Sequence, residues 1–202
     1  MLPGCMSMSY KPSVSLGEAP HTIKAKVKID KFTDISPAGD KEKAFGGTSA
    51  TAPGTLAGDL ETEVTDAVLS DFNNNQVFDT VKKRMDDPDL VLKGTINRFY
   101  GTAGPNAAFW LTLPIDPIWF FGIPVNSDQG KVDLTLEVFR NDRTRLGTYS
   151  GKCEFGDNYS MYNNPIWGLQ SRLNKCFSDA VMQIRTALAG DESKLTPATN
   201  TK

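Results

Sequence analysis

The chain has 202 residues, of which 39% are hydrophobic, and its formal net charge is -2. This length suits one domain of ordinary size and is too short for two large ones. The near-balance of charge argues against nucleic acid as a partner, and the hydrophobic fraction supports a buried core but not a bundle of membrane helices. We therefore expect a single globular domain.

The first residues resemble a lipoprotein processing site. Leu2-Pro3-Gly4-Cys5 is similar to the lipobox of bacterial lipoproteins, in which the signal peptidase cuts before the cysteine. The resemblance implies that Cys5 carries an acyl anchor, such as palmitate, after removal of a signal peptide. In the enterobacterial sorting pattern an aspartate after this cysteine retains the protein in the inner membrane, so Met6 favours the outer membrane. The alternative is an ordinary chain start with a stray cysteine, because no basic segment and apolar run precede Cys5.

Residues 6–20 are rich in Ser, Pro and Gly and lack periodicity, which predicts a flexible tether between anchor and domain. A strand follows over residues 23–29, where apolar residues alternate with Lys24, Lys26 and Lys28. The row of lysines suggests an acidic ligand. The solvated outer face of a half-buried or edge strand explains it better, because lysine commonly blunts exposed strands.

Residues 35–55 contain several glycines and prolines, which predict a loop. A helix is expected over 56–73, with an apolar stripe on one side and acids in its first half, where the helix dipole favours negative charge. Short strands are expected over 77–81 and 90–99. The acidic run at 86–89 lacks the spacing of a calcium loop and predicts a turn.

The segment 105–126 is rich in apolar and aromatic residues, and we expect Trp110, Trp119, Phe120 and Phe121 to contact the membrane or a neighbouring subunit. Its prolines exclude a transmembrane helix. Three interpretations remain open. The segment folds back over the domain as a buried flap, it enters the lipid interface, or it packs against a neighbouring subunit.

Clear strand patterns return at 131–140 and 146–155, joined by a hairpin at 141–144. A polar loop is expected at 158–165, and the apolar spacing predicts a long amphipathic helix over 167–188. Residues 190–202 are expected to form a disordered tail.

Together these elements predict an α/β (α+β) fold over residues 21–189. Its architecture would be a two-layer sandwich, in which two helices pack on a mainly antiparallel sheet. Cys153 and Cys176 lie on a strand and on the last helix. In an oxidising compartment they could form a disulfide, whereas in the cytosol both would be thiols.

The chemistry of an enzyme is missing from the sequence. His21 is the only histidine and lies at the end of the expected tether. There is no cysteine and histidine spacing typical of zinc sites and no phosphate-binding glycine loop. We expect a non-enzymatic protein with no metal and no cofactor.

A longer resemblance concerns the domain itself. The strand at 23–34, the helix at 56–72 and the segments at 77–81 and 89–94 are similar to a domain of envelope lipoproteins. That domain is shared by the curli-secretion lipoprotein, the export lipoprotein of the Pel system and the amino-terminal domain of the Tol-system propeller protein. The resemblance covers residues 21–189, and the aromatic segment is an insertion relative to it.

This resemblance implies a lipid-anchored protein on the periplasmic face of the outer membrane. Its expected partners are the membrane and either further copies of itself or an envelope protein complex for transport, secretion or export. The alternative function is a periplasmic module that binds a lipid or another apolar ligand.

Overall fold

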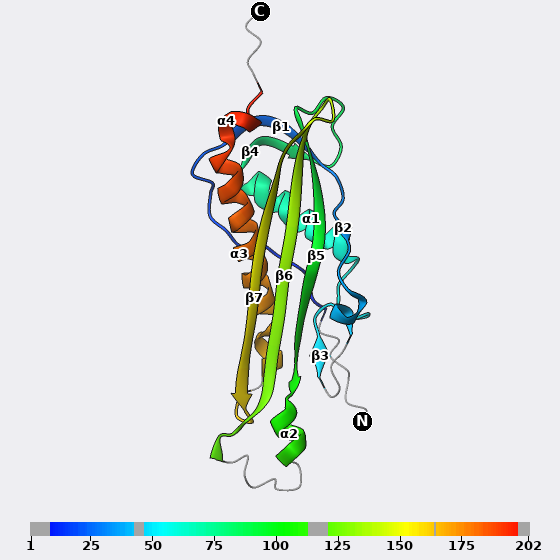
Figure 1. Cartoon of the computed structure of the whole chain (residues 1–202), viewed down its shortest axis with the longest axis vertical. Helices are drawn as coiled ribbons and strands as arrows, with labels where there is room; N and C mark the ends of the chain where they lie inside the picture. The colour runs from blue at the N-terminus through cyan, green and yellow to red at the C-terminus, as the bar shows by residue number, and fades with distance from the viewer. Residues whose placement is uncertain (1–8, 43–46, 113–120, 164, 198–202) are drawn as a thin grey trace, which may run out of the picture.

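The computed structural model describes residues 9–42, 47–112, 121–163 and 165–197. Within these residues seven strands form one open sheet, and four α-helices accompany it (Figure 1). The predicted fold class, a mainly antiparallel sheet packed with helices in two layers, is confirmed. The strands are β1 (Ile23–Ile29), β2 (Thr33–Asp34), β3 (Thr48–Ser49), β4 (Phe78–Lys82), β5 (Leu90–Pro105), β6 (Pro124–Arg140) and β7 (Arg145–Ser160). The helices are α1 (Leu60–Asn74), α2 (Ala107–Thr112), α3 (Leu169–Gly190) and α4 (Glu192–Leu195), with short 3-10 turns η1 (Ala38–Lys41) and η3 (Pro165–Gly168).

The sheet combines a parallel part and an antiparallel part. Its order is β4-β1-β5-β6-β7, and β2 and β3 pair with β5 beyond this path. β1 runs parallel to β4 and to β5, while β5, β6 and β7 form a long antiparallel meander. β1 therefore lies inside the sheet and is not an edge strand. Its lysines alternate with the buried apolar residues, so they lie on the outer face of a half-buried strand.

The core lies between the sheet and the two long helices. The apolar residues of β1 are buried on one side, and the apolar stripes of α1 and α3 are buried against them. α1 begins at Leu60, four residues later than the sequence pattern predicts, because Asp59 caps it by accepting a hydrogen bond from the Thr62 N–H at 3.3 Å.

The three meander strands are longer than their sequence patterns predict. β5 continues past Phe99 to Pro105, β6 starts at Pro124, and β7 ends at Ser160. The extensions carry glycines and polar residues instead of a clean alternation, and they pair with one another in register, for example Gly101 with Gly130. Backbone hydrogen bonds between neighbouring strands hold these extensions together, and the side-chain pattern does not reveal such bonds.

The expected flexible tether is wrong for residues 9–20, which we call the strap. Tyr10 is fully buried, lies 6.4 Å from the Phe99 ring and donates a hydrogen bond to Asn174 of α3 at 2.9 Å. Further along, Ser15 N–H donates to Ser178 at 3.0 Å, and the Gly17 carbonyl accepts from Arg185 at 2.8 Å. The strap follows α3 because its backbone groups are satisfied by polar side chains of that helix.

The expected disordered tail is also wrong in its first part. α4 follows α3 directly, and Leu195 is buried in the core. Burial of the Leu195 side chain contributes about 2 kcal/mol to holding this turn, and the Tyr149 hydroxyl donates a hydrogen bond to Asp191 at its start at 2.8 Å. Residues 198–202 lie outside the described residues, as does the expected anchor Cys5.

Candidate functional site

The candidate site is the end of the molecule at which β5 and β7 finish and β6 begins (Figure 1). Asn106 organises it. Its N–H donates to the Val125 carbonyl at 3.0 Å, and its side-chain amide donates to the Pro124 carbonyl at 3.1 Å. Its side-chain oxygen accepts from the Phe109 N–H at 3.2 Å, which caps the short helix α2. Asn106 thus fixes α2 at the end of the meander.

Large apolar side chains are concentrated at this end, which we call the aromatic end. Leu111 is 79% exposed, Phe121 is 84% exposed and Trp167 is 73% exposed. Of the eight large apolar side chains exposed among the described residues, six lie here: Trp110, Leu111, Phe121, Met161, Tyr162 and Trp167. Such a concentration on a single domain indicates a contact surface.

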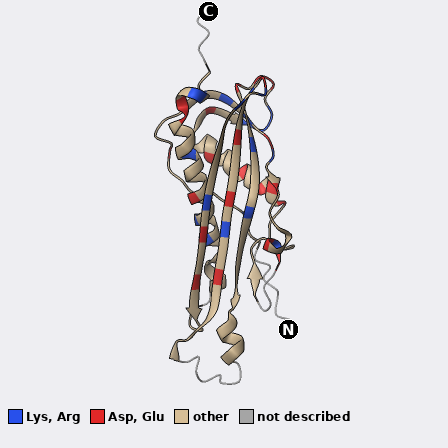
Figure 2. Cartoon of the chain, in the orientation of Figure 1, with Lys and Arg blue, Asp and Glu red and all other residues tan. Residues whose placement is uncertain are grey.

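The aromatic end also lacks charge. In the sequence, Asp116 is the only charged residue between Arg98 and Asp128, and none occurs between Asp157 and Arg172. The antiparallel pairing of β6 with β7 brings these two stretches to the same end, where Pro124 is paired with Ser160. In Figure 2 the described residues of this end show neither blue nor red, whereas the rest of the body carries both signs.

An ion pair between a buried carboxylate and a partly exposed guanidinium supports the aromatic end from behind. Asp128 of β6 has no exposed side-chain surface and pairs with Arg172 of α3. Asp128 also accepts the Asp157 N–H at 3.0 Å, and Arg172 donates to the Pro165 carbonyl at 2.7 Å. Arg172 lies 5.4 Å from the Tyr159 ring, and burial raises the pKa of that phenol. This network fixes η3, and with it Trp167, against the last turns of the meander.

The structure places part of the predicted contact set. Trp110 and Phe121 lie together at the aromatic end, so for these two side chains the buried flap is not what the structure shows. Trp119 and Phe120 lie outside the described residues. Met161, Tyr162 and Trp167 were missed by the sequence prediction. The signal that could have found them is the run of fourteen uncharged residues from 158 to 171.

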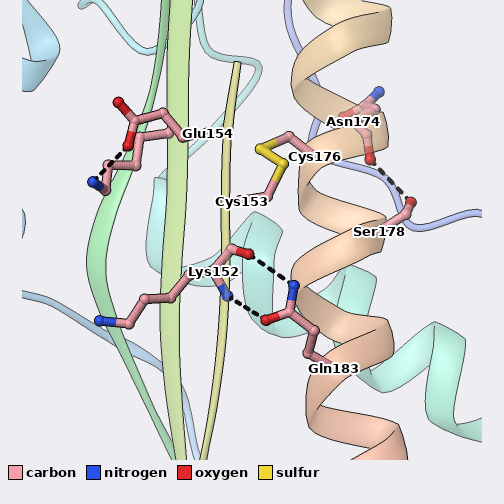
Figure 3. Close-up of a disulfide and its surroundings, with 8 residues drawn as sticks. Lys152, Cys153, Glu154, Asn174, Cys176, Ser178 and Gln183 are labelled. Atoms are coloured by element: carbon pink, nitrogen blue, oxygen red, sulfur yellow. Dashed lines mark hydrogen bonds and ion pairs between the residues drawn. A yellow bond between two sulfur atoms is a disulfide. The ribbon is translucent and has the colours of Figure 1, made fainter.

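The two cysteines are joined in the seam between β7 and α3 (Figure 3). Cys153 and Cys176 form a disulfide with a Cα separation of 5.3 Å, so of the two alternatives the structure has the bridge. Beside it, the side-chain amide of Gln183 bonds both backbone groups of Lys152, at 3.0 and 2.8 Å. Gly151 allows the close approach, because a Cβ there would collide with the Ala180 carbonyl. The outer edge of β7 is thus occupied by the protein's own helix.

A small apolar pocket lies behind the strap. Its volume is about 230 Å³, and its walls include Ala19, Ile23, Val77 and Met182. The guanidinium of Arg185 borders it and pairs with buried Asp71 at 3.3 Å. Burial raises the pKa of Asp71, while Arg185 and then Asn75 oppose the shift. This pocket suits only a small ligand, since sites for drug-sized molecules begin at about 300 Å³.

The described ranges contain neither a metal-binding cluster nor a helix that could span a membrane. No group of three or more His, Cys, Asp and Glu side chains there is placed to hold a metal ion. Among the helices of those ranges, none combines the length and the apolar character that crossing a membrane requires.

No protein-family model and no curated protein matches the chain. Among solved structures, a Xanthomonas campestris protein of the family DUF330 has a TM-score of 0.49 at 13% identity, over 90% of this chain and 91% of that one. A protein from Caulobacter crescentus, classed provisionally as a lipoprotein, has a TM-score of 0.35 at 10% identity, over 81% and 91%. A hypothetical protein from Chlamydia trachomatis has a TM-score of 0.42 at 9% identity, over 85% and 98%.

Proposed function

We propose that this protein is a non-enzymatic lipoprotein of the outer membrane, anchored through Cys5 on the periplasmic face, whose aromatic end lies against the lipid leaflet. In this proposal it serves as an assembly or accessory component of an envelope complex for transport, secretion or export. The observation that carries the membrane contact is the gathering of six exposed apolar side chains at an end whose described residues carry no charge.

The composition of this end favours lipid over a protein partner. Tryptophan, tyrosine and phenylalanine partition well into the interface between headgroups and acyl chains. A protein interface commonly carries a polar rim with charged groups around its apolar centre. The described residues of the aromatic end provide no such charge, and they come from both η3 and α2 at one extremity of an elongated molecule (Figure 2).

The position of the strap agrees with anchoring at the same end. Covalent geometry limits the Cα atom of Cys5 to within about 18 Å of that of Tyr10, five residues later. Tyr10 is fixed beside Phe99, from which β5 runs six further residues, about 20 Å, to the aromatic end. An acyl chain on Cys5 and the aromatic end can therefore reach one leaflet together.

The disulfide supports a location outside the cytoplasm, because such bonds persist in oxidising compartments and are rare in the reducing cytosol. The assembly role rests on the resemblance to the curli, Pel and Tol domains and stays a prediction. Mass analysis of the mature protein isolated from membranes tests the anchor. Unmodified protein with a free Cys5 thiol would contradict it.

The membrane contact is tested separately from the anchor. A Cys5→Ser protein is mixed with vesicles of phosphatidylethanolamine and phosphatidylglycerol, and binding is measured by flotation. Phe121→Ser and Trp167→Ser should each weaken binding about tenfold, a conservative value for the loss of about 2 kcal/mol of apolar burial. Matched controls are Ile35→Ser and Met182→Ser, which remove exposed apolar side chains elsewhere and should leave binding unchanged.

The other interpretations of the aromatic end give different results in the same experiment. If Phe121→Ser and Trp167→Ser leave vesicle binding unchanged but alter the molar mass in light scattering, the surface is a subunit contact. If only the thermal stability falls, the side chains belong to a packed flap. Either result contradicts the membrane proposal.

A second candidate is the binding of a small apolar ligand in the pocket behind the strap. The pocket's walls favour it, since most of them are apolar. Native mass spectrometry of the purified protein tests it. A co-purified apolar molecule that is lost in Ala19→Trp, which fills the pocket, would support this function.

A further inference from the structure

The opposite end of the molecule carries a groove with a different chemistry. It has a volume of about 490 Å³ and lies on the helix-free face of the sheet, beside the hairpin that joins β6 to β7. Lys28, Val91 and Phe139 occupy one row across β1, β5 and β6, because Lys28 is in register with Val91 and Val91 with Phe139. Val91 and Phe139 are half-buried and form an apolar floor.

Positive charge surrounds this floor. Lys28, Lys93, Arg140 and Arg143 line the groove, and Asp30 is the one carboxylate among the lining residues. Asp30 is paired with Lys28 at 3.0 Å. Lys93 lies 5.0 Å from the centre of the Phe139 ring. We call this hollow the cationic groove.

Three of the four cations have no ion pair within 4 Å among the described residues: Lys93, Arg140 and Arg143. Two acids close in sequence or register to these cations are engaged by other groups. Glu137, which is opposite Lys93 in the register, is paired with Arg145 at 2.9 Å. Asp142 accepts a hydrogen bond from the Thr144 N–H at 2.8 Å. This bond is the main reason why the pKa of Asp142 is lowered, and the charge of Arg140 also lowers it. The groove therefore keeps an excess of positive charge over an apolar floor.

The backbone conformation of Arg143 is unusual for a residue with a side chain. Arg143 has a φ of +70°, a left-handed conformation that glycine or asparagine adopts at lower cost. Glycine at this position would stabilise the hairpin turn, yet the chain has an arginine, and Arg143 lines the groove.

We propose that the cationic groove binds a small anion that carries two or more phosphate groups. Guanidinium groups bind phosphate oxygens in pairs, and ammonium groups add charge without fixed direction. The apolar floor strengthens each contact, because it excludes water from one side of the anion. The groove lies far from the aromatic end, so this inference does not depend on the proposed membrane contact.

The test is titration calorimetry of the whole protein with inorganic tripolyphosphate at physiological salt. The wild type should show saturable binding of one anion. Lys93→Gln with Arg140→Gln should weaken it by at least about tenfold, as loss of charged hydrogen bonds does. Arg143→Gly should weaken it to a similar degree while the melting temperature does not fall, because glycine relieves the left-handed backbone.

The matched control is Lys152→Gln, which removes a cation that is paired with Asp133 at 2.9 Å, outside the groove. Its affinity for tripolyphosphate should equal that of the wild type. Absence of saturable binding, or equal weakening by Lys152→Gln and by the groove variants, would overturn the proposal, since the binding would then follow net charge alone.

A parallel measurement distinguishes the source of the phosphate. The same proteins are mixed with phosphatidylcholine vesicles with and without cardiolipin, a lipid whose headgroup carries two phosphate groups. Binding of tripolyphosphate without binding to the cardiolipin vesicles assigns a free ligand to the groove. Binding of both, lost in the groove variants and kept in Lys152→Gln, assigns a lipid headgroup.

Discussion

The two ends of this molecule differ in the kind of side chain that they expose. The aromatic end exposes tryptophan, tyrosine, phenylalanine, leucine and methionine and has no charged residue among those described. The cationic groove at the other end exposes lysine and arginine above a half-buried floor. The same long strands, β5 and β6, carry both regions (Figure 1). The length of these strands therefore keeps the apolar surface of the aromatic end apart from the charged surface of the cationic groove.

The two ends are also supported differently. The aromatic end is held by the ion pair of buried Asp128 and by the side chain of Asn106. In the hairpin beside the cationic groove, the Arg140 N–H donates to the Thr144 carbonyl at 2.8 Å and the Arg143 N–H donates to the Arg140 carbonyl at 2.9 Å. A buried carboxylate is sensitive to the loss of its cation, because the remaining charge stays buried.

The largest effect is expected for Arg172→Met, which leaves Asp128 buried without its cation. The free energy of unfolding should fall by about 3 kcal/mol, the lower end for a buried pair, because the Asp128 carboxylate stays buried without its cation while Arg172 itself is 29% exposed. Urea denaturation followed by circular dichroism measures it. Arg145→Met is the control, since its partner Glu137 is on the surface, and it should cost about 0.5 kcal/mol. Equal losses in the two variants would contradict the support that we assign to the aromatic end.

The disulfide should contribute nearly as much to the free energy of unfolding. It joins β7 to α3 in the middle of the molecule, between the two ends. Cys153→Ala with Cys176→Ala should lower the free energy of unfolding by about 3 kcal/mol, the chain-entropy value for a loop of this size. Denaturation of the wild type with and without a reducing agent gives the same comparison. A reducing agent should have no effect on the variant, and a loss there would point to another cause.

A smaller effect of opposite sign is expected at the cationic groove. Arg143→Gly should raise the free energy of unfolding by about 1 kcal/mol, because glycine adopts a positive φ without the steric cost of a side chain. Thermal unfolding measures the change. Arg145→Gly is the comparison, since Arg145 begins a strand, where glycine should destabilise the fold by about 0.5 kcal/mol.

The smallest effect concerns pH and the second buried pair, Asp71 with Arg185. Burial raises the pKa of Asp71 in the folded protein. The contribution of this carboxyl is therefore fully present below its unfolded pKa, about 4, and is lost as the pH rises through the folded value. Relative to Asp71→Asn, the wild type should lose stability as the pH rises above about 4. Parallel denaturation series from pH 3 to 7 measure the difference, and a difference that is constant or opposite in slope would show that Arg185 outweighs burial.

Much of the fold could be predicted from periodicity. The alternation in β1 and β6 and the apolar stripes of α1 and α3 identify the buried faces, because side chains repeat every two residues in strands and every 3.6 in helices. The strap and α4 could not be predicted in this way. Their few buried groups, such as Tyr10 and Leu195, gain partners only from helices and strands that are distant in the sequence.

The candidate site shows the same division. The sequence by itself determined that residues 105–126 are rich in apolar residues and contain Trp110 and Phe121, because the composition of a segment does not depend on which residues lie near it in the fold. Only the tertiary structure decided that Trp167 lies at the same end, because the antiparallel ladder brings the start of β6 beside the end of β7. It likewise decided the bond between Cys153 and Cys176, which depends on a Cα separation. The cationic groove follows the same logic, for Lys28 and Arg143 become neighbours only through the order of the strands in the sheet.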